Sequence, residues 1–500
     1  MFSLTENKVH ELYARFKAKA KAAYSRKSYN ECLRLLTAAA KTGYEFYLGY
    51  KDEEIESMLQ DLSSQIERAE PDINVVSNTV VCYDSFSIDT GGLMHQYLRA
   101  LIASGYRIMY LAEKNRILRE DSAMGNLLRN YDRSEVVVIP SDLKPLAKAQ
   151  FVYDTIVSSG ASKLFIHSNP SAGFACCAFY ALPSIITKYK INLTDHTYWI
   201  GTGFIDYSLE FRPYGGQLSC YRRGLKPSQI LHIPFYPIME HKQFMGFPEE
   251  ANGKVVLFSG GAFYKIFDKE DTFFRLSKAI LEKCRNLIIL FAGQGDTVVL
   301  QEKLKEYQIE DRFLLLGYRK DITEVFSHCD IYMNTYPYGG GLMAQYAAQM
   351  GKPIVSYYTP GHTPVEDLVC QRKRVVLSDD SFDGMVNKVC ELAEDVAYRE
   401  SLGAEIRDCV ITSDVFNQLF AQCLESGVNP MPYQEQEPFK EIKWDIQDKL
   451  TFENTNKGYQ RSVAKGLGVS SLWLCPTFII NSWAAIIKSN RVWTVIRNRI

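Results

Sequence analysis

The sequence predicts an α/β protein with two tandem Rossmann-like domains, a helical N-terminal segment and an amphipathic C-terminal tail. Apolar runs of strand length alternate with helical patterns between residues 72 and 240, and the alternation returns between residues 253 and 427. Strands separated by helices form mostly parallel, doubly wound sheets. The chain has 500 residues, of which 46% are apolar, which is enough for two large domains with separate cores. The predicted units are a helical accessory domain at 1–70, a first Rossmann-like domain at 71–240, a second at 241–430 and the tail at 431–500.

Composition excludes several classes of protein. The net charge of −1 argues against general nucleic-acid binding. The twelve cysteines form no CxxC pair and lie mostly in apolar runs such as Ala175–Ala178. We therefore expect core thiols of a reducing compartment, and neither a zinc site nor a disulfide framework. The N-terminal segment is amphipathic and lacks the apolar stretch of a secretory signal, so the expected location is the cytoplasm.

The N-terminal segment, residues 5–69, is predicted to be helical. Apolar spacing over 29–48 and 53–66 indicates helices with a break near Gly49, and Pro71 closes the segment. Lys21–Ala40 faintly resembles one tetratricopeptide hairpin, but no second copy follows at the expected period. A small accessory helical domain is the expectation.

Ten strands are predicted in the two α/β domains. Those of the first domain are Asn74–Tyr83, Arg107–Ala112, Glu135–Pro140 and Lys163–His167, with helices starting near Gly92, Leu146 and Ser171. Those of the second are Val255–Ser259, Leu287–Ala292, Phe313–Gly317, Asp330–Asn334, Ile354–Tyr357 and Val375–Ser378. The proline-rich stretch Pro234–Pro248 joins the domains. Ligands bind at the carboxyl ends of strands in such sheets, so the site is expected in the cleft between the two domains.

A glycine turn follows the strand Asp330–Asn334. Gly339, Gly340 and Gly341 precede a helix, and Gly351–Pro353 leads into the next strand. Backbone amides exposed by glycines at a helix N-terminus form an anion site, and a diphosphate is the most plausible anion here. The alternatives stay open: the glycines could merely allow a tight turn, and Asn334 and Thr335 could either contact the donor or simply end a strand.

The loop Ser87–Gly92 opens the first domain and is followed by a long helical pattern. It resembles the first glycine loop of GT-B glycosyltransferases, which passes beside the donor phosphates, and this resemblance implies donor contacts for Gly91 and Gly92. Neither GxGxxG nor GxxxxGK[ST] occurs, which counts against a dinucleotide dehydrogenase and a P-loop nucleotidase.

The second domain resembles the O-GlcNAc transferase-like family more specifically. Phe263–Ile266 looks like that family's LYKI stretch, whose lysine contacts the donor diphosphate, and Lys265 occupies that position; the alternative is a solvated surface lysine. Similarity continues through the succession His196–Gly201, Asp206-Tyr207, Gln229–Pro234, Asn334-Thr335 and Gly351–Pro353, and it spans roughly Asn192–Val369. The chain thus resembles a bacterial GT-B glycosyltransferase.

The sequence departs from that family at the phosphate-gripping triplet. Gly341, Leu342 and Met343 stand where the family has His-Thr-Thr, and Tyr346 replaces the ribose-binding aspartate. Gln345 occupies the second acidic slot of the E-x7-E signature of other GT-B families, and it is kept as a donor-side candidate. The amides of Gly339–Gly341 together with Lys265 could still hold a diphosphate.

Candidates for the general base are Asp89, His95 and His196, the last beside Asp195. Asp89 could instead cap a helix, and His95 could be packed in a core. Glu210 and Arg212 are candidates for contact with the acceptor, although they could instead pair with each other. The GT-B resemblance implies that Gln294 and Tyr318 lie beside the nucleotide base of the donor. No DxD motif lies at a strand end, since Asp379-Asp380 is on a late loop, so we expect no metal and no cofactor.

The tail carries no acidic residue after Glu453, and its basic residues give a charge of +7. The apolar stretch from Ser471 is about 17 residues long and broken by Pro476, so it is too short for a membrane span. Basic flanks with Trp473, Trp483 and Trp493 fit a segment lying on an anionic membrane surface. The alternative is that the tail packs back across both domains.

The expected function is sugar transfer from a nucleotide-sugar, with a UDP-sugar as the expected donor, to a hydroxyl of a glycan or lipid-linked glycan, as in cell-surface polysaccharide synthesis. The second domain would bind the donor, the first would present the acceptor, and the reaction would be metal-independent. The alternatives are a protein O- or N-glycosyltransferase, and a catalytically degenerate scaffold or sugar-binding protein. The expected location is cytoplasmic or peripheral at the inner face of the plasma membrane.

Overall fold

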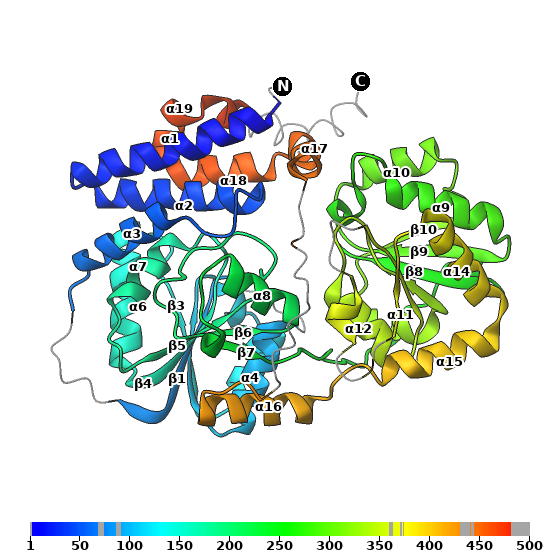
Figure 1. Cartoon of the computed structure of the whole chain (residues 1–500), viewed down its shortest axis with the longest axis horizontal. Helices are drawn as coiled ribbons and strands as arrows, with labels where there is room; N and C mark the ends of the chain where they lie inside the picture. The colour runs from blue at the N-terminus through cyan, green and yellow to red at the C-terminus, as the bar shows by residue number, and fades with distance from the viewer. Residues whose placement is uncertain are drawn as a thin grey trace.

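The structure is a computed structural model that describes residues 3–68, 75–86, 92–359, 364–370, 373, 375–430, 441 and 445–481. Two α/β domains lie side by side, and helices from both ends of the chain cover one side of the first domain (Figure 1). This architecture confirms the predicted fold class of two tandem Rossmann-like domains with helices at the N-terminus.

The first domain contains a seven-stranded parallel sheet in the order β3-β2-β1-β4-β5-β6-β7. Its strands are β1 (Val76–Asp84), β2 (Arg107–Ala112), β3 (Ser134–Val138), β4 (Ala161–His167), β5 (Thr187–Ile191), β6 (Tyr207–Glu210) and β7 (Ile230–His232). Its helices are α4 (Leu93–Ala103), α5 (Ala123–Arg129), α6 (Pro145–Ser158), α7 (Gly173–Ala181) and α8 (Pro213–Tyr221). The sequence predicted β1 to β4 but not the last three strands, which are short and, in β5, interrupted by two lysines.

The second domain contains a six-stranded parallel sheet in the order β10-β9-β8-β11-β12-β13. Its strands are β8 (Val255–Gly260), β9 (Leu287–Ala292), β10 (Phe313–Gly317), β11 (Ile331–Met333), β12 (Ile354–Tyr357) and β13 (Ser378–Asp379). Its helices are α9 (Thr272–Lys283), α10 (Thr297–Glu306), α11 (Ile322–His328), α12 (Gly341–Gln349), α13 (Glu366–Val369), α14 (Phe382–Glu394) and α15 (Val396–Arg407). All six strands were predicted, although the last one begins three residues later than expected.

Helix α16 (Ser413–Ser426) returns to the first domain, whereas the prediction assigned it to the second. Phe416 and Phe420 of this helix each lie with their ring centroids 5.2 Å from that of Tyr97 in α4. Both rings are buried in the core of the first domain. The apolar face of α16 therefore belongs to the first sheet, which no sequence pattern indicated.

The N-terminal helices α1 (Glu6–Ser25), α2 (Tyr29–Glu45) and α3 (Glu53–Leu62) share one core with the first α/β domain. Glu56 in α3 is buried, and its carboxylate accepts hydrogen bonds from the backbone amide of Gly201 at 2.6 Å and from the Tyr180 hydroxyl at 2.5 Å. A buried carboxylate satisfied across the boundary ties the two parts together. The helical segment is therefore packed as a layer of the first domain.

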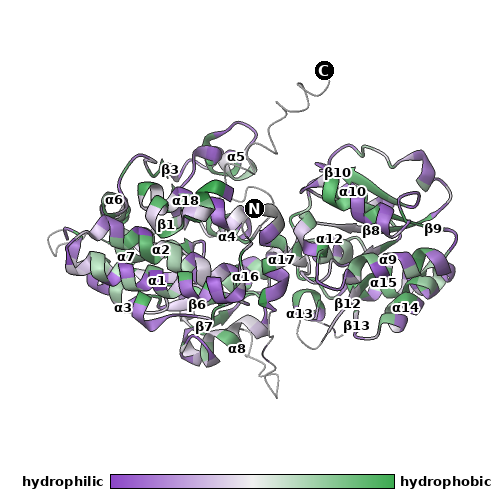
Figure 2. Ribbon diagram, turned by 90° about the horizontal axis from the view of Figure 1, so that it is seen from above, coloured by the Kyte–Doolittle hydropathy of each residue, from purple (hydrophilic) through white to green (hydrophobic). Residues whose placement is uncertain are grey.

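The described part of the tail packs back onto the N-terminal helices. It forms α17 (Ile446–Asn456), α18 (Gly458–Leu467) and α19 (Ser471–Leu474). The hydroxyls of Tyr459 and Thr42 lie 2.7 Å apart, which joins α18 to α2. Figure 2 views the molecule from above and places α17 between the two α/β domains. None of the helices in the described ranges is both long and apolar enough to span a bilayer.

Cysteine pairing differs from the prediction at one place. Cys284 and Cys390 form a disulfide where α9 packs against α14. The other ten cysteines form no disulfide, and eight of them are buried. The expectation of core thiols therefore holds for most of the set, while the packing of two helices brings this one pair together.

Candidate active site

A cavity of about 460 Å³ lies between the two α/β domains. Its lining residues follow the carboxyl ends of strands in both sheets, as expected for doubly wound domains. The volume falls in the range of small-molecule sites. Residues of the N-terminal helices and of the tail also line it, namely Tyr44, Tyr47 and Lys449.

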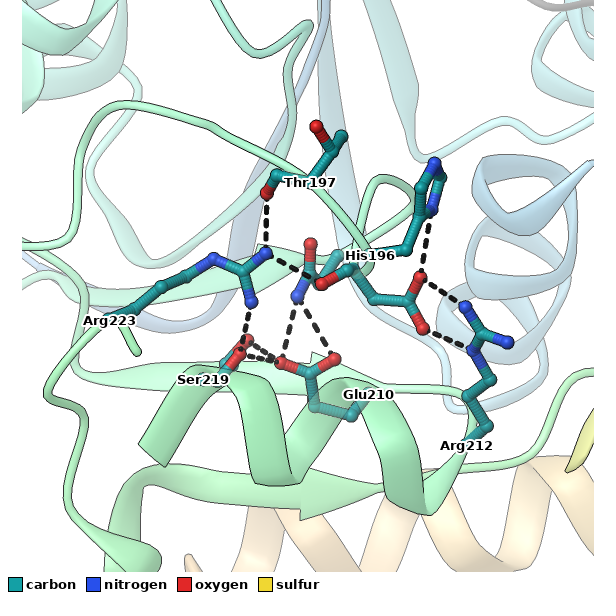
Figure 3. Close-up of polar contacts among 9 residues, drawn as sticks. His196, Thr197, Glu210, Arg212, Ser219 and Arg223 are labelled. Carbon is teal, nitrogen blue, oxygen red and sulfur yellow. Dashed lines mark hydrogen bonds and ion pairs between the residues drawn. The ribbon is translucent and has the colours of Figure 1, made fainter. Parts of the chain in front are cut away.

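A histidine and an aspartate form a pair on the wall of the first domain (Figure 3). His196 Nδ1 lies 3.2 Å from Asp195 Oδ1, in the loop that follows β5. Asp195 is fully buried, whereas the His196 side chain is 33% exposed. With Nδ1 donating to the carboxylate, the basic lone pair of the neutral ring is on Nε2. This arrangement suits proton abstraction.

Arg212 holds Asp195 in its charged form. Its Nε and a terminal nitrogen donate to the two carboxylate oxygens at 2.5 and 2.8 Å (Figure 3). Burial alone would raise the pKa of Asp195, but the charge and hydrogen bonds of Arg212 outweigh it and hold that pKa well below its usual value. Burial lowers the pKa of His196, and Asp195 opposes this effect only in part, so the pKa of the ring stays below its ordinary value.

A second buried layer supports the loop that carries this pair. Arg223 donates to the backbone carbonyl oxygens of Asp195 and Thr197, both at 2.6 Å (Figure 3). Glu210 is fully buried and accepts from Asn192 at 2.9 and 3.0 Å and from Ser219 at 2.7 Å. Glu210 does not pair with Arg212 and does not line the cavity, so its predicted acceptor contact is not supported. Arg212 does line the cavity.

On the opposite wall, Lys265 points to the glycine turn. Its Nζ donates to the carbonyl oxygen of Gly339 at 3.3 Å. The part of the chain that the structure describes gives Lys265 no carboxylate partner, and burial lowers the pKa of its amine. A lysine without a counter-charge in a cavity favours binding of an anion.

The glycine turn is shaped by the two polar residues that end β11. Asn334 Oδ1 accepts from the amide of Gly340 at 2.9 Å, and Thr335 Oγ1 donates to the carbonyl oxygen of Tyr338 at 2.6 Å. Asn334 and Thr335 therefore shape the turn and do not line the cavity, and the amide of Gly340 is already used. Gly339 and Gly341 do line it. Among the described residues no side chain is seen to cap α12, so the amides of its first turn can serve a ligand.

Several predicted residues lie away from the cavity. Gln345 is buried and donates to the carbonyl oxygens of Phe235 and Leu368 at 3.0 and 2.9 Å, so it anchors α12 to the interdomain segment. Gln294 and Tyr318 are exposed on the surface, and Tyr318 is 56% exposed. These placements do not support the predicted donor contacts of the three residues.

The first glycine loop is only partly described. Gly92 caps α4 and lines the cavity, together with Leu93 and Gln96. His95 is buried in the same helix and does not line the cavity. Asp89 and Gly91 lie outside the described residues. Across the described ranges no cluster of three or more metal-ligating side chains occurs.

Arg223 and the contributions of Tyr44, Tyr47 and Lys449 were not predicted from the sequence. Arg223 stands in a basic run, and the tyrosines belong to an ordinary amphipathic helical pattern. Lys449 is more than 180 residues from Lys265 in the chain. No local signal distinguishes such residues from solvated ones, because their role depends on packing between distant segments.

Comparison with known proteins agrees with this geometry. Residues 253–395 match the family of group 1 glycosyl transferases. An O-GlcNAc transferase mutant from Thermobaculum terrenum has a TM-score of 0.53 and 14% identity, covering 84% of this chain and 81% of its own. Anabaena Alr3699/HepE, solved with UDP and glucose, has a TM-score of 0.51 and 14% identity, covering 70% of this chain and 99% of its own.

A glycosyltransferase from Rickettsia africae has a TM-score of 0.50 and 10% identity, covering 70% of this chain and 98% of its own. No curated protein sequence matches the chain. At these identities the structural likeness establishes the fold, and the family match concerns the second α/β domain. Together they show that the chain has the GT-B fold and that its second α/β domain is similar to the group 1 glycosyl transferases.

Proposed function

We propose that this enzyme transfers a sugar from a UDP-sugar to a hydroxyl of a glycan or glycolipid acceptor, without a metal ion. The observation that carries the proposal is that one cavity has a group suited to accept a proton on one wall and groups suited to bind an anion on the other. A histidine–aspartate pair lies on one wall, and a lysine with a glycine-opened helix N-terminus lies on the other. Such a cavity suits an acceptor hydroxyl on the first side and a diphosphate on the second.

In the proposed reaction, His196 Nε2 removes the proton of the acceptor hydroxyl as its oxygen attacks the anomeric carbon. The bond from that carbon to the diphosphate oxygen breaks, and the nucleoside diphosphate leaves with the bonding electrons. Asp195 stabilises the imidazolium that forms, as the carboxylate does in other histidine–carboxylate pairs. Arg212 keeps Asp195 ionised and oriented for this role.

The charge that grows on the leaving group would be offset on the second wall. Lys265 supplies a full positive charge, and the amides at the start of α12 supply oriented dipoles. These groups can take the place of a metal ion. UDP is the first nucleotide to test because Alr3699/HepE was solved with UDP, and the two proteins share their fold.

The acceptor class is inferred from the tail. Trp473 is 84% exposed, and Leu472 and Ile480 are 53% and 55% exposed. Exposed apolar side chains next to a basic segment favour an anionic membrane surface, where a lipid-linked acceptor would be found. Sedimentation with vesicles tests this proposal: wild type should bind vesicles that contain phosphatidylglycerol more than neutral ones, and Trp473→Ser should bind less. Equal sedimentation of the two proteins would remove the membrane proposal.

The activity is tested by release of nucleoside diphosphate from UDP-glucose, UDP-galactose and UDP-N-acetylglucosamine, with and without membrane glycolipid extract and in the presence of EDTA. The expected result is acceptor-dependent release that EDTA does not reduce. Release that is lost in EDTA and restored by Mn²⁺ would contradict metal independence. Tight UDP binding without turnover of any donor would favour a degenerate binding protein.

A further inference from the structure

We propose that Lys449, carried by the C-terminal helix α17, is a second lysine of the donor diphosphate site, and that Tyr47 of the N-terminal helices positions it. This inference rests on the proposed function, because the ligand is the diphosphate of the same donor. It adds a residue from the far end of the chain to a site built on the second α/β domain.

Lys449 lines the cavity beside the two segments assigned to the diphosphate. Its Nζ lies 5.0 Å from the ring centroid of Tyr338 and 5.7 Å from that of Tyr264. Tyr338 directly precedes Gly339, and Tyr264 directly precedes Lys265. Both lysines therefore line the cavity next to Tyr264 and Tyr338, whose ring centroids are 5.8 Å apart.

Within the described residues the Lys449 amine has no ion pair and no side-chain hydrogen bond, and it lies over the rings of three tyrosines. Burial lowers the pKa of its amine, against weaker opposing effects of Glu45 and Glu453. Glu453 is occupied elsewhere, since its carboxylate accepts from the amides of Tyr459 and Gln460 at 2.9 and 3.0 Å. A partly desolvated cation without a bonded counter-charge favours an anionic ligand.

Hydrogen bonds to the N-terminal segment hold the backbone of α17, which carries Lys449. Asn454 of α17 exchanges two hydrogen bonds with the backbone of Leu4, at 2.6 and 2.9 Å. Gln447 donates to Glu6 at 2.9 Å. The helix is thus held by the N-terminal layer of the first domain, while Tyr264 and Tyr338 belong to the second domain. A diphosphate bound by both lysines would connect the two sides of the cleft.

Tyr47 supports the placement of Lys449 from the N-terminal layer. It follows α2 with φ of 54°, a left-handed conformation that non-glycine residues rarely adopt. Its ring centroid lies 5.5 Å from Lys449 Nζ, and its hydroxyl is hydrogen-bonded to that of Tyr338. Three parts of the chain therefore meet over the phosphate end of the cavity: the N-terminal layer, the tail and the second α/β domain.

The test compares Lys449→Met, which keeps the side-chain length and removes the charge, with Lys465→Met, an exposed lysine of the same tail. Calorimetry measures the Kd of UDP, GDP, ADP and uridine for each protein, after thermal unfolding has shown an unchanged melting temperature. Loss of a charge-assisted contact to the diphosphate should weaken UDP binding by about tenfold to hundredfold. Uridine binding should not change, and Lys465→Met should bind UDP as wild type does.

The outcomes separate the inference from the proposed function. If wild type binds none of the nucleoside diphosphates, the proposed function fails. If wild type binds UDP and Lys449→Met binds it equally, the inference is overturned and the function stands. Equal weakening of UDP and uridine would also overturn it, because the contact would then be with the nucleoside. If Lys449→Met is unstable, Lys449→Gln provides a second neutral variant, and Lys449→Arg should recover most of the affinity.

Discussion

The two walls of the cavity differ in whether their charged side chains have partners of opposite charge. On the first wall, Asp195 is bound by Arg212 and faces His196, so each charge has a partner inside the protein. On the second wall, Lys265 donates only to a backbone carbonyl among the described residues, and Lys449, which reaches the same end of the cavity from the tail, contacts only aromatic rings there. A satisfied network orients a base, whereas unsatisfied cations favour an anionic ligand. The division of labour between the two walls follows from this difference.

Removal of the base should give the largest effect. His196→Ala should lower kcat by about 100-fold to 10,000-fold, because general base catalysis contributes about that much. The Kd of UDP should remain within about twofold, since the donor contacts lie on the other wall. Steady-state kinetics and calorimetry check the two parts. A kcat within tenfold of wild type would assign the proton transfer to another residue.

Breaking the network of the first wall should cost stability. Arg212→Met leaves Asp195 buried without its partner, and the free energy of unfolding should fall by about 3–5 kcal/mol. Because the folded-state pKa of Asp195 is lowered, the stability from this pair is present above the unfolded pKa of about 3.9 and is lost as the pH falls below it. Urea denaturation at pH 7 measures the loss, and Arg222→Met at a largely exposed ion pair is the control, with a loss of about 1 kcal/mol or less.

Removal of a cation from the second wall should act on affinity and not on folding. Lys265→Ala should weaken UDP binding by about tenfold to hundredfold, as expected for a charge-assisted contact. The free energy of unfolding should change little or rise slightly, because an unbalanced buried charge is lost. Calorimetry and urea denaturation measure the two quantities. A loss of stability with unchanged UDP affinity would mean that the two walls do not differ as described.

The acid side of the pH dependence should reflect the first wall. The proposed mechanism requires neutral His196, and burial places its pKa below the ordinary value of about 6.5, so kcat/KM should stay level down to that lowered pKa and then fall by about tenfold per pH unit. Asp195 raises the pKa of His196, so Asp195→Asn should shift this acid limb to lower pH while it lowers the maximum rate. A shift to higher pH would contradict the assignment.

The smallest effects are expected at two residues for which the GT-B resemblance implied contact with the nucleotide base of the donor. Gln294→Ala and Tyr318→Ala should change the Kd of UDP by less than about twofold, because both side chains are exposed away from the cavity. Calorimetry under the same conditions as for Lys265→Ala checks this. A tenfold loss in either variant would show that the bound protein closes onto these loops.

Local sequence patterns were enough to predict most of the fold. The alternation of apolar strand runs and helices identified all six strands of the second sheet, since side-chain periodicity and turn residues are local properties. The position after a parallel strand, together with the resemblance to the LYKI stretch for Lys265, also singled out Lys265 and the glycine turn, and Lys265, Gly339 and Gly341 line the cavity. The three short strands of the first domain were not predicted, since three to five residues carry too little pattern to stand out from a loop.

The remaining parts of the site depend on packing between segments that are far apart in the chain. Asp195 is hydrogen-bonded to Arg212, and Gln345 is hydrogen-bonded to Phe235. Lys449 contacts tyrosines of the second domain. These contacts form only when the domains and both chain ends pack together. A charged residue has the same sequence signature whether it is solvated, paired or left to bind a ligand. Its role is set by burial and by the partners that the folded chain provides.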